Sequence, residues 1–175
     1  MRGLSVFLFA LLLAAHAGAQ DGLSLQGVGT GGFGWRAIGP AAFGGRIQDV
    51  DVVPGSTDTI FVATASGGIF KTTNRGVTWK AVFDRDGRTL SLGDVTIAAA
   101  DPDIVWAGTG EANNRQSSSW GDGVYKSMDG GETWKHMGLA DTQHIGRIVI
   151  DPQDPNIVYV AALGKLWGPN TERGV

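Results

Sequence analysis

The stretch SMDGGETW at residues 127–134 has a counterpart earlier in the chain, TTNRGVTW at residues 72–79. Both fit S/T-x-D/N-x-G-x-T-W at every fixed position, and Trp79 and Trp134 lie 55 residues apart. In such a stretch the Asp or Asn side chain caps backbone N–H groups of a tight turn, Gly adopts a conformation that other residues avoid, and Trp buries a large apolar surface. We therefore expect two equivalent hairpin turns in two copies of a repeated unit. The positions expected to build them are Thr72, Asn74, Gly76, Thr78, Trp79, Ser127, Asp129, Gly131, Thr133 and Trp134.

The rest of the repeat is readable on both sides of these turns. Three segments, GRIQDV from residue 45, GDVTI from residue 93 and GRIVI from residue 146, start successive units, with Arg46, Asp94 and Arg147 in matching places. Each start leads into a turn rich in Pro, Asp or Asn and then into a short β-branched and aromatic run. The first two units continue with GIFKT or GVYKS, which lead into the hairpin turns.

Four short strands in each unit of about 50 residues predict an all-β fold, a β-propeller with four-stranded antiparallel blades. The expected organisation is a signal peptide (1–19), a leader with an N-terminal strand (20–44), blade 1 (45–92), blade 2 (93–145) and a partial blade 3 (146–175). Because a propeller typically closes with four to eight blades, these two and a half blades are expected to be incomplete, the opening of a longer protein. The third strand of blade 3 is expected to begin at Gly174-Val175.

Composition limits the chemistry. The chain of 175 residues has 28 glycines, no cysteine and a formal net charge of −3. Cysteine nucleophiles, thiolate zinc sites and disulfides are therefore excluded, and without a basic stripe no nucleic-acid partner is expected. The apolar run Leu4–Ala15 followed by AGA at residues 17–19 predicts a cleavable signal peptide and a secreted or periplasmic protein. A membrane anchor is the alternative, but twelve apolar residues are too few, because a span needs about 20.

The hairpin pattern resembles the Asp-box, or bacterial neuraminidase repeat (BNR). Segments such as GTGE at residues 108–111 and AALGKLWG at residues 161–168 are similar to exported bacterial propellers described as sortilin-like, glycosyl hydrolase-like or YVTN/BNR-like. The resemblance runs from about Trp35 to the end of the chain. It implies a large propeller with a polypeptide or carbohydrate ligand and the remaining blades as partners, and it leaves the reaction open.

Propeller topology predicts where a ligand would bind. Loops that enter first strands and loops between second and third strands share one end of the blades, and the hairpin turns lie at the other end. The long insertion at residues 111–122 contrasts with the short turn at residues 65–67, and a second insertion begins at residue 163. Long loops on a rigid scaffold often bind ligands, although a solvated loop with internal hydrogen bonds is the alternative. The candidate ligand-binding residues are Arg46, Asn113, Asn114, Arg115, Trp120, His144, Arg147 and Trp167.

Hydrolysis of a glycan is the alternative function to binding as a scaffold. A glycosidase needs two acids flanking the bond, and Glu111, Asp94 and Asp122 are the candidates in this stretch. Two departures weaken this hypothesis: the sialidase Phe-Arg-Ile-Pro motif is missing, and the acid that precedes Gly-Gly in blade one of xyloglucanase-type propellers is replaced in ASGG at residues 65–68. A third hypothesis is an assembly or stability factor for envelope complexes.

No metal or cofactor is expected. A calcium loop at residues 129–132 is a weak alternative, because the run lacks alternating oxygen ligands. His136 and His144 have no metal-ligand spacing. The pattern GxGxxG at residues 29–34 matches a dinucleotide fingerprint, but no strand precedes it and no helix follows it.

Overall fold

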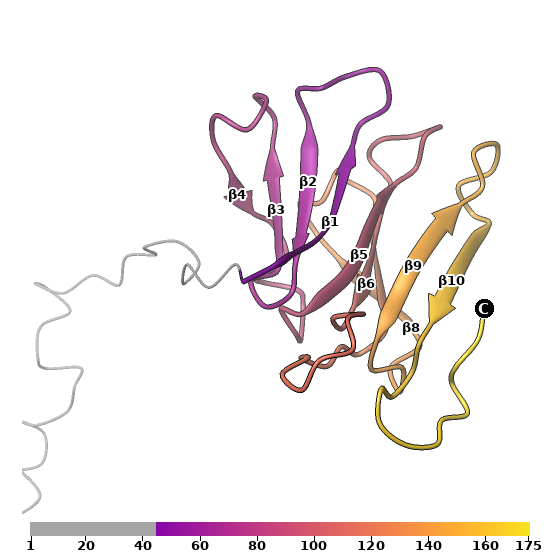
Figure 1. Ribbon diagram of the computed structural model, residues 1–175. Helices are drawn as coiled ribbons and strands as arrows, with labels where there is room; N and C mark the ends of the chain where they lie inside the picture. The colour runs from indigo at the N-terminus through magenta and orange to yellow at the C-terminus, as the bar shows by residue number, and fades with distance from the viewer. Residues whose placement is uncertain (1–44) are drawn as a thin grey trace, which may run out of the picture. The chain divides into compact units, whose positions relative to one another are not determined.

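A computed structural model describes residues 45–175, and the predicted signal peptide and leader lie outside this range. The described residues form three antiparallel sheets (Figure 1). Sheet 1 has the order β1-β2-β3-β4, sheet 2 has the order β5-β6-β7-β8, and sheet 3 pairs β9 with β10. The strands are β1 (Ile47–Val52), β2 (Ile60–Thr64), β3 (Ile69–Thr72), β4 (Lys80–Ala81), β5 (Leu92–Ile97), β6 (Val105–Thr109), β7 (Val124–Ser127), β8 (Lys135–Gly138), β9 (Ile145–Ile150) and β10 (Val158–Ala162).

The all-β prediction is confirmed for the described residues, with two four-stranded units and part of a third. β5 and β9 each begin one residue before the predicted unit boundaries. At the predicted start of a third strand, Gly174 forms an isolated β-bridge with Ala162, in which Ala162 N donates to Gly174 O at 2.8 Å. The same bond joins Thr64 to Gly68 at 3.1 Å and Thr109 to Gly123 at 3.0 Å in the complete sheets.

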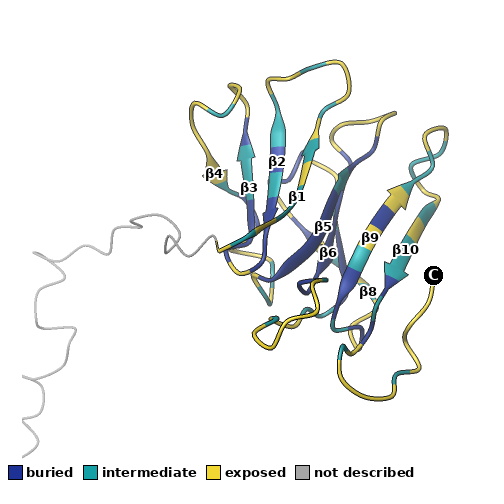
Figure 2. Ribbon diagram, in the orientation of Figure 1, coloured by how far each residue is buried: buried dark blue, intermediate teal, exposed yellow. Residues whose placement is uncertain are grey.

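The core consists of two layers, one on each face of sheet 2. Sheets 1 and 2 enclose a cluster that includes Phe61, Phe83 and Trp134, and sheets 2 and 3 enclose a second cluster around Trp106 and Ile145. Sheet 2 is therefore covered on both faces, and all five residues of β6 are buried. Figure 2 shows this contrast between the buried centre and the more exposed β1 and β10.

The first strands of the sheets, β1, β5 and β9, lie in contact in that order. Close approach of β9 to β5 depends on Gly93, because a Cβ at this position would lie 2.0 Å from the Ile145 carbonyl oxygen. Any side chain here would force the two sheets apart.

The two hairpin turns, called capped turn 1 (72–79) and capped turn 2 (127–134), have matching hydrogen bonds. In turn 2, Gly131 N donates to Ser127 Oγ at 2.8 Å, and Thr133 N donates to Asp129 Oδ1 at 2.9 Å. In turn 1, Gly76 N donates to Thr72 Oγ1 at 2.9 Å, and Thr78 N donates to Asn74 Oδ1 at 2.9 Å. Both glycines have positive φ, 83° for Gly76 and 88° for Gly131.

The two tryptophans of these turns differ in burial. Trp134 is 7% exposed, and its Nε1 donates at 2.8 Å to the carbonyl oxygen of Val82, the residue after β4 of sheet 1. Trp79 is 44% exposed, because in the described part of the chain no sheet covers it as sheet 1 covers Trp134. The expectation of a buried indole therefore holds for turn 2 and is wrong for turn 1 within residues 45–175.

We predict that Asp129→Asn is tolerated and Asp129→Ala is not. Asn74 performs the same capping in turn 1, where its Nδ2 donates to Thr78 Oγ1 at 2.8 Å, so Asn at position 129 needs only a reversal of the Thr133 hydroxyl. Alanine leaves the Thr133 N–H without its cap, at a cost of about 1 kcal/mol. Urea unfolding of both variants and the wild type measures this, and equal losses for Asn and Ala would contradict it.

The ionised Asp129 accepts hydrogen bonds mainly from Thr133, which lowers its pKa from 3.8 to about 2.

Candidate functional site

The loops at the end of the sheets opposite the capped turns are held by matching residues that precede each first strand. The carbonyls of Arg46, Ser91 and His144 accept hydrogen bonds from the N–H groups of Ala65, Gly110 and Leu163, at 2.9, 2.7 and 2.9 Å. Arg46, Ser91 and His144 therefore occupy one repeat position.

This register corrects the sequence alignment of Arg46 with Asp94 and Arg147. Opposite Ala63, Gly108 and Ala161 the strands place Asp49, Asp94 and Arg147. Arg46 therefore lies three residues before the repeat position shared by Asp49, Asp94 and Arg147. All three first strands have their irregularity at the same place, and similarity of short sequences does not reveal this offset.

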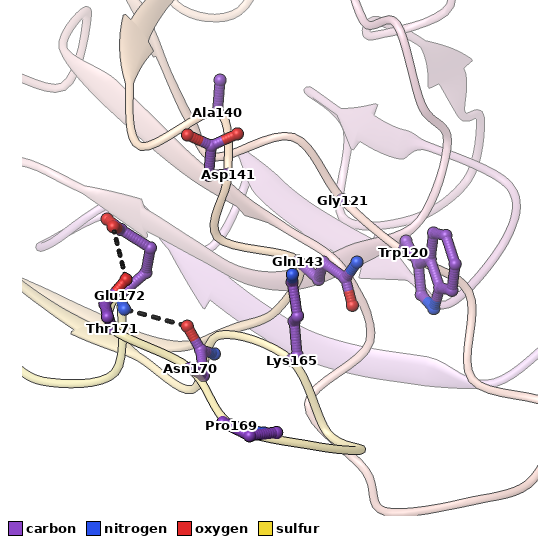
Figure 3. Close-up of a pocket in the computed structure, with 10 residues that line it drawn as sticks. All are labelled: Trp120, Gly121, Ala140, Asp141, Gln143, Lys165, Pro169, Asn170, Thr171 and Glu172. Carbon is purple, nitrogen blue, oxygen red and sulfur yellow. Dashed lines mark hydrogen bonds between the residues drawn. The ribbon is translucent and has the colours of Figure 1, made fainter.

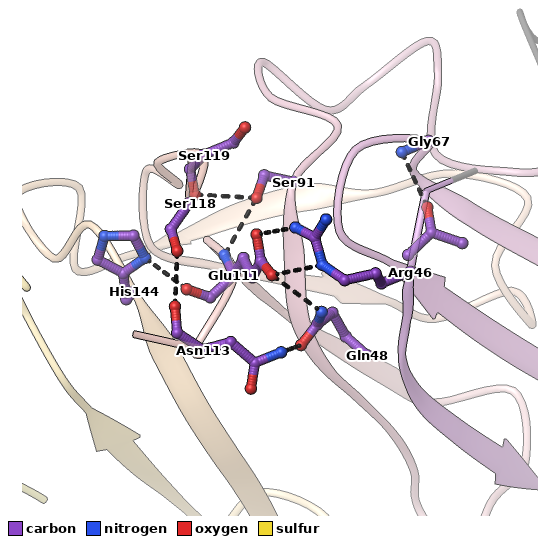
Figure 4. A network of polar contacts seen from close by, with 10 residues as sticks. Arg46, Gln48, Gly67, Ser91, Glu111, Asn113, Ser118, Ser119 and His144 are labelled. Atoms are coloured by element: carbon purple, nitrogen blue, oxygen red, sulfur yellow. Dashed lines mark hydrogen bonds and ion pairs between the residues drawn. The ribbon is translucent and has the colours of Figure 1, made fainter. Parts of the chain in front are cut away.

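The side chains of Arg46, Ser91 and His144 converge on Glu111, at the root of the 111–122 loop (Figure 4). Arg46 Nε donates to Glu111 Oε1 at 2.8 Å, and its Nη2 contacts Oε2. Glu111 N donates to Ser91 Oγ at 3.0 Å, and His144 Nδ1 lies 2.8 Å from Glu111 O. Three sheets thus fix the root of one loop.

Glu111 is a buried member of an ion pair. Its side chain is 1% exposed, whereas that of Arg46 is 39% exposed. A carboxylate with both oxygens bound to one guanidinium already has its hydrogen-bond acceptors occupied, and here it is shielded from solvent. This geometry favours a positioning role for Glu111 over direct contact with a ligand.

The loop also contains the internal hydrogen bonds expected of a self-supporting structure. Ser118 Oγ donates to Asn113 O at 2.6 Å, and Asn113 Nδ2 donates to Gln48 Oε1 at 3.0 Å. Asn113 therefore connects the loop to β1, while Asn114 and Arg115 are exposed. Sequence reasoning missed Gln48 and Ser91, which become recognisable only when the strand register is known.

His144 is buried at its contact with Glu111. Burial lowers the pKa of its imidazole below the ordinary value, so the ring is neutral at pH 7 and its Nδ1–H donates to the Glu111 carbonyl. Its Nε2 is buried without a hydrogen-bond partner among the described residues.

Asp94 lies on β5 and connects sheet 2 to sheet 3. Its Oδ2 accepts a hydrogen bond from Ile148 N at 2.9 Å, and Arg147 Nη1 donates to its Oδ1 at 3.2 Å. Burial raises the pKa of this carboxyl to about 6, because desolvation and the nearby Asp49 outweigh these favourable contacts. Arg147 also lies 3.6 Å from Asp49, so the three matching first-strand residues form one cluster.

Asp122 lies at the other end of the loop and orders the start of β7. Tyr125 Oη donates to Asp122 Oδ2 at 2.8 Å, and Asp122 N donates to Thr109 Oγ1 at 2.8 Å. Burial and then this bond raise the pKa of Tyr125 to about 12. Each of the three candidate acids, Glu111, Asp94 and Asp122, thus accepts hydrogen bonds from protein groups, and no two of them share a partner.

A pocket of about 530 Å³ opens at this end of the sheets (Figure 3). It is formed by the end of the 111–122 loop, the segment before β9 and the loop after β10. Trp120, which is 65% exposed, lies on one side of the pocket and Glu172 on the other in this view. The lining residues are Trp120, Gly121, Ala140, Asp141, Gln143, Lys165, Pro169, Asn170, Thr171 and Glu172.

The pocket offers unengaged donors and acceptors. Within residues 45–175, the Asp141 carboxylate and the Lys165 ammonium have no hydrogen bond or ion pair, and the Asn170 side-chain Nδ2 is buried without a partner. Sequence reasoning identified Trp120 but missed these residues, since isolated polar residues in loops carry no pattern. Trp167, the other predicted aromatic, is exposed outside the pocket lining.

No group of three or more His, Cys, Asp or Glu residues within 45–175 could hold a metal ion. The same part of the chain has no helix that is long and apolar enough to cross a membrane.

Comparisons with known proteins found similarity to a xyloglucanase and to a solved GH74 enzyme. The chain is 26% identical, over 144 residues, to an oligoxyloglucan-reducing end-specific xyloglucanase of Emericella nidulans, a match that covers 77% of this chain and 17% of the relative. It superposes with a TM-score of 0.55 and 22% identity on an ancestral GH74 enzyme, over 66% of this chain and 16% of that one. The fold is that of a β-propeller. No protein-family model matches the sequence.

The chain therefore spans about a sixth of the length of the proteins that it matches.

We predict that stability falls between about pH 4 and pH 6 because of Asp94. Its pKa in the folded protein, about 6, exceeds the ordinary 3.8, so in this range the folded state holds a proton that the unfolded state has lost. The contribution of Asp94 to stability is fully present below pH 4 and is lost as the pH rises through 6, by about 3 kcal/mol. Urea unfolding at several pH values measures it, with Asp94→Asn as the control that lacks this dependence; parallel profiles would contradict the assignment.

We predict that Arg46→Ala destabilises more than Glu111→Gln. Removing Arg46 leaves a buried carboxylate uncompensated, at a cost of about 3 kcal/mol or more. Removing the charge of Glu111 leaves an arginine that is already partly exposed and can reach water. Unfolding free energies of the two variants and the double variant test this order, and a larger loss for Glu111→Gln would overturn it.

Proposed function

We propose that this chain contributes to a carbohydrate-binding β-propeller of the glycoside hydrolase type. We propose further that the pocket beside Trp120 is a subsite for a neutral oligosaccharide. The observation that carries the proposal is the pocket itself: an exposed indole beside unengaged carboxylate, ammonium and amide groups. Sugar rings present apolar C–H faces that pack on aromatic rings, and their hydroxyls both donate and accept hydrogen bonds.

The location supports this proposal. The pocket lies at the end of the sheets where the two long loops meet. The start of the first loop is held by the contacts of Arg46 and His144 with Glu111. A fixed loop keeps Trp120 in place before a ligand arrives, which reduces the ordering cost of binding. The similarity to a xyloglucanase favours a xyloglucan-derived ligand over the polypeptide that a sortilin-like scaffold would bind.

Hydrolysis is the second candidate function, and the same relative supports it. The chemistry needs two carboxylates about 5–10 Å apart on either side of the bond. Because Glu111, Asp94 and Asp122 are occupied by protein groups, we propose that they position loops and strands. Asp141 and Glu172 are the acids of this segment that line the pocket.

The capped turns fit the Asp-box pattern, and we propose that they are the scaffold of a BNR-type repeat. An exported protein, as the apolar N-terminal run predicts, would meet polysaccharides outside the cytoplasm.

We predict that Trp120→Ala reduces the affinity for xyloglucan oligosaccharides by about tenfold, because aromatic anchors supply a large share of binding energy. Isothermal titration calorimetry measures it. Trp79→Ala is the matched control, since it removes an exposed indole at the opposite end of the strands. Equal affinity of Trp120→Ala and the wild type would refute the pocket as the subsite.

Release of reducing ends from xyloglucan by the wild type and by Asp141→Asn separates the two candidate functions. Loss of turnover with unchanged affinity supports hydrolysis at this pocket. Weaker binding with proportionate turnover supports a subsite alone.

A further inference from the structure

Capped turn 2 binds to sheet 1 through three residues of that sheet. Lys71 Nζ donates to Gly130 O at 2.7 Å, and Lys80 Nζ pairs with Glu132 Oε2 at 2.6 Å. Phe61 lies directly under the turn, because a Cβ on Gly131 would be 2.8 Å from its Cε1 atom. These three residues are called the sheet 1 receptor. Phe61 contacts a glycine of the turn, Lys71 a carbonyl and Lys80 an acid.

Sheet 2 carries an aromatic ring and two lysines at the same register positions. Phe61 pairs with Lys71 across β2 and β3, and Trp106 pairs with Lys126 across β6 and β7. Lys71 then pairs with Lys80, as Lys126 pairs with Lys135.

The stacking of lysine on the aromatic ring is also repeated. Lys71 Nζ lies 5.5 Å from the centre of the Phe61 ring, and Lys126 Nζ lies 5.4 Å from that of Trp106. Trp106, Lys126 and Lys135 are called the sheet 2 receptor.

The polar groups of the sheet 2 receptor have no hydrogen-bond or ion-pair partners in the described part of the chain. Neither Lys126 nor Lys135 makes a hydrogen bond or an ion pair within residues 45–175. In sheet 1, by contrast, Lys71 donates to Gly130 O and Lys80 pairs with Glu132, both of capped turn 2. The Trp106 Nε1 atom is buried without a hydrogen-bond partner in the same range. A buried N–H without an acceptor costs about 1–3 kcal/mol, so an acceptor that reaches it would stabilise the protein.

We propose that the sheet 2 receptor is a docking site for a capped hairpin turn of the third repeat unit, with the pattern S/T-x-D/N-x-G-[D/E]-T-W. The glycine is required by contact with the aromatic ring, and the acid pairs with Lys135 as Glu132 pairs with Lys80. A carbonyl of the turn accepts from Lys126, and Trp106 Nε1 supplies a second donor that Phe61 lacks.

The occupant follows from the start of a third strand at Gly174. In sheets 1 and 2 the matching strands, β3 and β7, lead straight into the capped turns. A second copy of the chain fits less well: its turn 2 already occupies its own sheet 1, and its turn 1 has Val77 where the acid is needed.

The test extends the full chain with a copy of residues 125–138 joined directly after Val175, in register with Val124. The extension should raise the midpoint of urea unfolding and slow the hydrogen exchange of the Trp106 indole N–H in NMR spectra by at least about tenfold. Replacing the second glycine of the extension, its copy of Gly131, by Leu should abolish both effects. Persistence of both effects in this glycine variant, or no effect of the unmodified extension, would overturn the proposal.

A charge exchange tests the predicted ion pair between Lys135 and the acid of the extension. Lys135→Glu should lower the midpoint of the extended chain, and replacing the acid of the extension by Lys in that variant should restore it. No restoration would overturn the predicted pairing.

If the extended chain does not fold, the unmodified protein is titrated with a synthetic peptide of residues 123–138, and the Trp106 indole signal is followed. A shift that Lys135→Glu weakens by about threefold or more supports the docking site, and no shift at millimolar peptide overturns it.

Discussion

The arrangement of the three sheets depends on carboxylates that reach from one first strand to the backbone of the next. Neighbouring sheets share no backbone ladder, so apolar packing alone would let them slide. Asp49 Oδ2 accepts from Val95 N at 3.2 Å, Asp51 Oδ2 accepts from Ile97 N at 2.7 Å, and Asp94 repeats the Asp49 contact on Ile148. These bonds fix the relative register of the sheets, and the loops at one end can meet only because that register is fixed.

The fixed register explains why one repeat position, occupied by Arg46, Ser91 and His144, can surround a single loop root. Each residue has a different chemistry, and each engages a different part of Glu111. The repeated backbone supplies the positions, and the divergent side chains make the site. The pocket beside Trp120 is then formed in part by a loop whose first residue is held in place by hydrogen bonds.

The opposite end of the sheets has a structural role. There the capped turns use short polar side chains to close hairpins, and turn 2 also ties sheet 2 to sheet 1 through Lys71 and Lys80. The loops that line the pocket and the contacts of turn 2 with sheet 1 therefore lie at opposite ends of the strands. The loops can vary in sequence without loss of these contacts between sheets.

The sequence by itself determined the strands, the repeat and the capped turns, because hydrophobic alternation, turn residues and the T-W pattern are local properties. It also indicated Trp120, through the length of its loop. Only the tertiary structure decided that Glu111 is buried against Arg46, that Asp49 rather than Arg46 matches Asp94, and that Asp141 and Lys165 share a pocket. These facts depend on which strands face one another across sheets and on which residues pair along them, and no local pattern records either.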